Sequence, residues 1–148
     1  MTQKRPETVL LRKVVAFLSK TNLTWYFTGP DPYLAVLAKS GNKYLLGIAK
    51  KKAAIMGSKS GIPDICICDP PPAKPGCHGC YIELKAKKNG LTKAQKEWRD
   101  DLQSKGYHVG LVRDSLDNFK IHLVELGYKF RGSKTIAQRL SQYQAPQE

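Results

Sequence analysis

Two short segments decide the fold of this chain: IPDICIC at residues 62–68 and YIELKA at residues 81–86. The first is rich in β-branched residues and cysteine, and the second alternates apolar with charged residues. Both patterns are typical of β-strands. The connecting loop, residues 69–79, is rich in Pro and Gly. The sequence therefore predicts a hairpin with a long loop.

Charged residues stand inside these two expected strands, where acids and bases are unusual. Asp64 lies at the start of the first strand, and Glu83 and Lys85 lie within the second. Because side chains alternate along a strand, Glu83 and Lys85 share one face, while Ile82 and Leu84 face the core. Burying two charges without partners costs free energy. One interpretation is therefore a solvent-exposed ion pair on an edge strand.

The other interpretation of these charges is catalytic. Asp64 and Glu83 would lie side by side across the hairpin, and two carboxylates at one point repel each other unless a cation separates them. Hard oxygen ligands suit Mg²⁺ or Mn²⁺. Such an ion polarises a phosphoryl oxygen and activates water, and Lys85 could orient that water or offset charge on the phosphate. The pattern indicates phosphodiester hydrolysis.

The rest of the chain places helices around the strands. A capping box, Thr92 with Gln95, marks the start of one helix. We expect helices over residues 6–20, 31–38, 44–56, 92–106 and 115–126, with further strands at 25–28 and 107–113. This order predicts an α/β domain, a small mixed β-sheet flanked by helices, over residues 1–127. Residues 128–148 would be a basic tail with a short helix at 134–143.

The net charge points to a polyanionic partner. The chain has 25 Lys and Arg against 12 Asp and Glu, a net charge of +13, and the segment from Lys39 to Lys59 holds six lysines, both ends included, and no acid. Such a surface attracts nucleic acid, with an anionic membrane surface or a merely basic protein as alternatives. The lysines expected to contact DNA near the site are Lys50, Lys51, Lys52, Lys59, Lys87 and Lys88.

Length and composition set the broad class. A chain of 148 residues with 41% hydrophobic residues predicts one globular domain. No apolar run approaches the roughly 20 residues of a membrane span, and the N-terminus lacks the apolar core of a secretory signal. We expect a cytoplasmic protein, of a bacterial or phage-infected host cell, with no membrane partner.

Four cysteines leave a metal question open. Cys77 and Cys80 have the close spacing of a zinc knuckle, and Cys68 could approach Cys80 across the hairpin. Against a structural Zn²⁺ at Cys68, Cys77 and Cys80, this is half of a usual zinc motif, and strand cysteines such as Cys66 pack as small hydrophobes. His108 and His122 stand alone in the pattern and receive no role.

The flanking residues resemble a known family. SGIPDICI at residues 60–67, YIELKAKKNG at 81–90 and LTKAQKEW at 91–98 are similar to the virus-type replication-repair nuclease domain, VRR-NUC, of the PD-(D/E)XK nuclease superfamily. The resemblance runs from about Tyr44 to Val112. It implies a restriction-endonuclease-like core and an Mg²⁺- or Mn²⁺-dependent endodeoxyribonuclease.

The resemblance also implies roles for individual residues. Asp64 and Glu83 would hold the metal, Lys85 would assist catalysis and Gln95 would support the site. Gln95 could instead be only the capping-box partner of Thr92, since we expect that a side chain reaching back to the cap cannot also serve the site. The family's metal-binding Glu on the first helix corresponds to Glu7. An acid in a first helical turn is also favoured by the helix dipole alone.

Minimal members of this family are similar to Holliday-junction resolvases, which implies a homodimer acting on branched DNA. A C₂ pair would place two sites on one substrate. The alternatives are a nuclease specific for a duplex sequence, and a non-catalytic nucleic-acid-binding module that bound zinc could stabilise.

Overall fold

The computed structural model describes residues 6–29, 37–55 and 60–144. Its elements are α1 (Pro6–Leu18), β1 (Trp25–Phe27), α3 (Lys43–Ile55), β2 (Ile65–Ile67), β3 (Cys80–Lys85), α4 (Lys93–Ser104), β4 (His108–Arg113), α5 (Leu116–Glu125) and α6 (Ser133–Gln144). The helix expected at residues 31–38 falls mostly outside the described residues, although residues 37–40 are helical. The other expected elements are present with boundaries shifted by a few residues.

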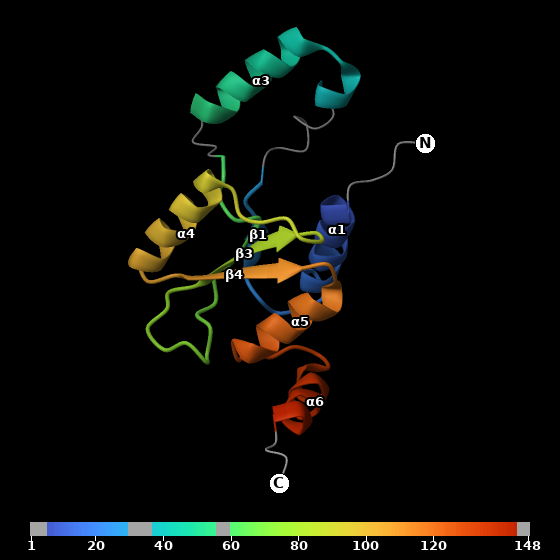
Figure 1. The fold of residues 1–148 in the computed structure, drawn as a ribbon, viewed down its shortest axis with the longest axis vertical. Coiled ribbons are helices and arrows are strands. Elements are labelled where there is room, and N and C mark those ends of the chain that lie inside the picture. Colours follow the sequence, from blue (N-terminus) through green and yellow to red (C-terminus); the bar gives the residue numbers. More distant parts are fainter. Residues whose placement is uncertain (1–5, 30–36, 56–59, 145–148) are drawn as a thin grey trace.

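The four strands form one mixed sheet in the order β1-β2-β3-β4. The pairs β1–β2 and β2–β3 are antiparallel, and β3–β4 is parallel. The hairpin predicted from the sequence is therefore confirmed, with Ile65 opposite Ile82. Helices flank the sheet (Figure 1), so the α/β class with a small mixed sheet is confirmed.

The core lies between the sheet and the helices α1 and α5. Ile65, Ile82 and Leu84 face it from the strands and are at most 3% exposed. The helices contribute Leu10, Val14, Leu18, Phe119 and Leu123. The opposite face of the sheet carries Glu83 and meets α4, whose Gln95 reaches that carboxylate.

The interpretation of an exposed ion pair on an edge strand is wrong. β3 lies inside the sheet because β2 pairs with one of its edges and β4 with the other. Glu83 is only 6% exposed and Lys85 only 8%. The sheet and the surrounding helices thus remove both charges from solvent. The attraction within an isolated ion pair rarely offsets the free energy that this desolvation costs.

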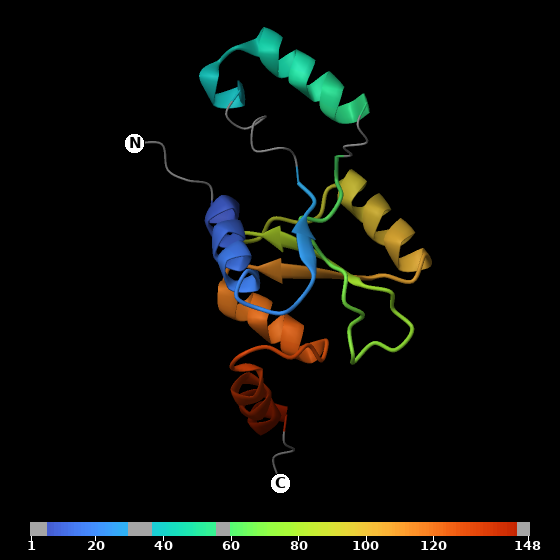
Figure 2. The same cartoon turned by 180° about the vertical axis from the view of Figure 1, so that it is seen from behind.

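The helices at the two ends of the molecule differ in their packing. Figures 1 and 2 show α3 at one end and α6 at the other, with the sheet between them. On α3, Tyr44 and Ile55 are 78% and 86% exposed, so this helix buries little of its apolar surface. On the α6 side, Tyr128 is buried and Phe130 packs against the core. The residues expected to begin the tail therefore contribute to the core.

Within the described residues, no helix combines the length and apolarity that spanning a membrane would require.

Candidate active site

Strand pairing brings Asp64 and Glu83 to the same place. Continuing the β2–β3 register by one residue sets Asp64 opposite Glu83, so both carboxylates lie on the face of the sheet away from the core. Asp64 is fixed there because its Oδ2 accepts a hydrogen bond of 2.8 Å from the backbone N–H of Leu84. The predicted juxtaposition across the hairpin is present.

The pKa values of both carboxyl groups are raised. Burial is the largest cause for each, because it disfavours the charged form. The negative charge of Asp64 adds to the effect at Glu83, whose pKa rises to about 8. A cation between the two groups would relieve both effects. Two neighbouring carboxylates, one buried and one half-buried, are therefore a donor set that fits a hard divalent ion.

Lys85 places a positive charge beside this pair. Its Nζ lies 3.7 Å from Oε1 of Glu83, and both side chains are almost fully enclosed. The ammonium lowers the pKa of both Asp64 and Glu83, although burial outweighs this contribution. Lys85 thus lies where it can contact an anionic group bound beside the carboxylates.

Gln95 makes two kinds of contact with one side chain. Its Oε1 accepts a hydrogen bond from the backbone N–H of Thr92, which completes the predicted capping box. Its Nε2 donates to Oε1 of Glu83 at 2.8 Å. The expectation that the capping and site contacts exclude each other is wrong, because a carboxamide carries an acceptor and a donor on separate atoms. The start of α4 is thereby joined to Glu83.

Glu7 approaches the same site from the first turn of α1. Its Oε1 accepts hydrogen bonds from Asn89 Nδ2 at 3.1 Å and from the backbone N–H of Ala86 at 3.4 Å. Its charge raises the pKa of Asp64. The helix dipole alone would not require these contacts, so Glu7 points inward, toward the loop that follows β3.

A single cavity of about 270 Å³ connects these groups. Its lining contains every catalytic or metal-binding residue expected from the sequence, namely Glu7, Asp64, Glu83, Lys85 and Gln95, together with Thr8, Leu11 and Leu84. The structure therefore brings together five side chains from α1, β3, α4 and the residue that precedes β2.

The expected DNA-contacting lysines fall into two groups. Lys87 and Lys88 are exposed in the loop that leaves β3 directly after Lys85. Three more are exposed on α3: Lys50, Lys51 and Lys52. Lys59 lies outside the described residues.

The cysteines are arranged differently from the expected zinc set. Cys68 is exposed and Cys77 is half-buried. Among the described residues, one group of three His, Cys or acidic side chains lies close enough together to hold a single ion, namely Cys80, His108 and His122. No local pattern in the sequence indicates this group, because His108 meets Cys80 only through the parallel β3–β4 pairing and His122 reaches them from α5.

Comparison with known proteins identifies the family. A family model for the VRR-NUC domain matches residues 6–115. The chain belongs to the VRR-NUC family. VRR-NUC domains are nuclease domains, so the family indicates nuclease and DNA-binding character for this chain. The match begins with α1 and so includes all five residues of the cavity.

A solved structure described as a VRR_NUC domain protein has the same fold. It is 24% identical in sequence, covers 80% of this chain and 84% of its own, and superposes with a TM-score of 0.54. At this identity the likeness concerns the VRR-NUC fold alone. Among curated proteins, none matches the chain significantly.

Proposed function

We propose that this VRR-NUC domain is a metal-dependent DNA endonuclease that hydrolyses phosphodiester bonds, and that its preferred substrate is branched DNA such as a four-way junction. One observation carries the proposal: the half-buried Asp64 and the buried Glu83, both with raised pKa values, share a cavity with the ammonium of Lys85. Two carboxyl groups that lie side by side can both be ionised only when a cation offsets their repulsion.

The donor set fits Mg²⁺ or Mn²⁺. Asp64 and Glu83 would hold the ion directly, because their oxygens are hard ligands from adjacent strands. Glu7 lines the same cavity; its Oε1 accepts hydrogen bonds from Asn89 and Ala86, and its second oxygen could join the ligands of the ion. When bound, the ion polarises the phosphoryl oxygen and lowers the pKa of an attacking water.

The remaining residues position the reactants. Lys85 would contact a phosphate oxygen and offset the charge that builds there during attack, which is worth most in a site shielded from water. Gln95 would fix the rotamer of Glu83 through the 2.8 Å hydrogen bond. Lys87 and Lys88, exposed beside the cavity, would contact neighbouring phosphates and orient the strand.

Selectivity for branched DNA and assembly as a homodimer are the finer parts of this proposal. They rest on the resemblance to minimal VRR-NUC members. A dimer with C₂ symmetry would present two equivalent cavities to a junction, which itself has near two-fold symmetry.

The direct test is cleavage by the purified chain in Mg²⁺ or Mn²⁺. We expect a four-way junction to be cut faster than a linear duplex made of the same arm sequences, and excess EDTA to stop both reactions. Equal rates on junction and duplex would overturn the branched-DNA preference. Binding of DNA with no cleavage under either metal would contradict the proposed nuclease activity and favour a non-catalytic nucleic-acid-binding module.

Gln95 offers a second prediction, with Thr92 as its matched control. Gln95→Ala and Thr92→Ala should each lower the free energy of unfolding by about 1 kcal/mol, because each removes part of the cap of α4. Only Gln95→Ala also frees Glu83, so it alone should lower kcat, by roughly ten-fold or more. Cleavage kinetics and thermal unfolding measure the two effects. Equal kcat values for the two variants would contradict the positioning role.

A further inference from the structure

Cys80, His108 and His122 converge on the core side of the sheet. The parallel register sets Cys80 at the start of β3 beside His108 at the start of β4, so both side chains lie on one face. His122 comes from α5, which packs on that face. The Cys80 sulfur and one ring nitrogen of each histidine all lie within 4.8 Å of one another.

The distance between the two imidazoles matches a coordination polyhedron. His108 Nε2 and His122 Nε2 are 3.4 Å apart. Two nitrogens bound to a tetrahedral zinc at about 2.0–2.1 Å are separated by about 3.3–3.4 Å. An N–H···N hydrogen bond between the rings would be long at this distance, since such bonds have typical lengths of roughly 2.7–3.2 Å. The two rings thus already have the spacing of a ligand pair.

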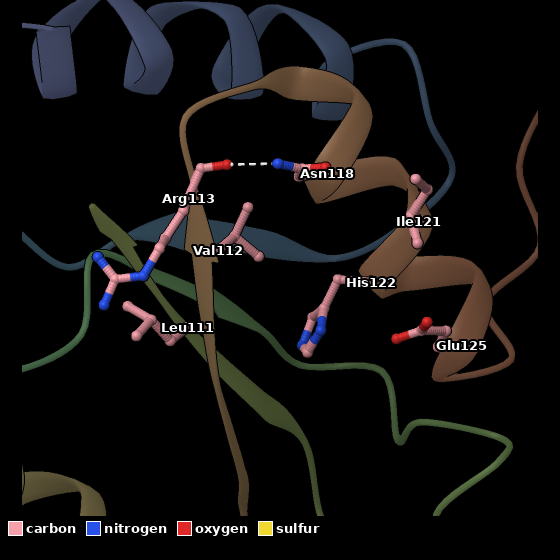
Figure 3. Close-up of a pocket in the computed structure, with 7 residues that line it drawn as sticks. All are labelled: Leu111, Val112, Arg113, Asn118, Ile121, His122 and Glu125. Atoms are coloured by element: carbon pink, nitrogen blue, oxygen red, sulfur yellow. Dashed lines mark hydrogen bonds between the residues drawn. The ribbon is translucent and has the colours of Figure 1, made fainter. Parts of the chain in front are cut away.

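Gly110 leaves the space that His122 occupies. A Cβ atom built at Gly110 would lie 2.2 Å from His122 Nε2, so any other residue there would push the ring away. Figure 3 shows the His122 ring projecting from α5 toward β4. Gly110 precedes Leu111 on β4, in the strand whose first residue is His108. The ring is therefore fitted into a gap beside the other histidine.

We propose that Cys80, His108 and His122 form a Zn²⁺ site. One sulfur and two imidazole nitrogens are ligands that zinc prefers, and three protein ligands leave a fourth position for water. A cavity of about 280 Å³ between β4 and α5, with His122 on its wall, offers that water a route (Figure 3). Bound zinc would join β3, β4 and α5.

The protonation states agree with metal binding. Burial lowers the pKa values of His108 and His122, and the charge of a protonated His122 lowers the pKa of His108 further. Both rings therefore favour the neutral form, which is the form that binds a metal. Burial raises the pKa of the Cys80 thiol, so a bound cation must displace its proton. The Mg²⁺ or Mn²⁺ site is separate, because Glu83 lies on the opposite face of β3.

Cobalt substitution tests the site without relying on nuclease activity. The full chain would carry Asp64→Asn, which weakens the carboxylate site, and would be stripped of metal under reducing conditions. On titration with Co²⁺ we expect a thiolate-to-cobalt charge-transfer band and tetrahedral visible bands, saturating at one ion per chain. Zn²⁺ should abolish both bands by displacement and should raise Tm.

Matched variants assign the ligands. Cys80→Ser should remove the charge-transfer band, and His122→Gln should weaken Zn²⁺ binding roughly a hundred-fold or more. Cys68→Ser, at an exposed thiol, should change neither result. Should a ligand variant fail to fold, Gly110→Ala, which displaces the ring, should reproduce the weakened binding. Absence of the charge-transfer band in the parent protein, or its survival in Cys80→Ser, would overturn the site and leave two packed histidines.

Discussion

Asp64→Asn should abolish DNA cleavage while leaving DNA binding intact. Asparagine has the size of aspartate and can still accept the hydrogen bond from the backbone N–H of Leu84, so β2 and β3 should keep their register. The change removes one of two carboxylates that would hold the metal. Because a catalytic ion contributes several kcal/mol to transition-state stabilisation, we expect a rate loss of roughly a thousand-fold or more.

Asp69→Asn is the matched control for this experiment. Asp69 also accepts a backbone hydrogen bond, from the N–H of Thr24 at 2.6 Å, but it does not line the catalytic cavity. We expect it to cleave at the parent rate. Single-turnover cleavage and a DNA-binding isotherm at fixed salt would measure the two properties separately. Cleavage by Asp64→Asn at the parent rate would remove the basis of the proposed enzyme.

The features that could be predicted from the sequence are those that neighbouring residues determine, such as helix ends and strand faces. The capping box of Thr92 and Gln95 defined the start of α4, and Gly106, with a φ of +90°, follows its end in the left-handed region that glycine favours. Strand alternation correctly placed Glu83 and Lys85 on one face. The hairpin then brought Asp64 beside Glu83, because two consecutive strands joined by a loop pair in antiparallel orientation.

Long-range pairing determined what the sequence did not predict. Lys85 is enclosed because β4 pairs with the second edge of β3. The residues around Lys85 in the sequence do not predict that pairing. The same parallel pairing sets His108 beside Cys80. The double role of Gln95 has a different origin: the capping box uses only the side-chain oxygen and leaves the nitrogen to donate to Glu83.

The metal-free protein should become less stable as the pH rises from about 5 to about 9. The ordinary pKa of a glutamate is 4.5, and that of Glu83 is raised to about 8 in the folded protein, first by burial and then by Asp64. The folded state therefore binds more protons than the unfolded state in this window, and its stability falls as Glu83 ionises. Asp64, whose pKa is also raised, acts in the same direction. We expect a loss on the order of 2 kcal/mol.

Divalent metal should reverse this dependence, because the ion competes with the proton for the same two carboxylates. Thermal unfolding in EDTA should give a Tm that falls with pH for the parent but much less for Glu83→Gln, which cannot ionise. Comparing the two proteins cancels the opposite contribution of His108 and His122, whose pKa values are lowered by burial. Added Mn²⁺ should raise the Tm of the parent more at pH 8.5 than at pH 5.5. An equal rise at both pH values, or the same rise in Glu83→Gln, would mean that the ion binds elsewhere, since protonated carboxyl groups do not ligate it.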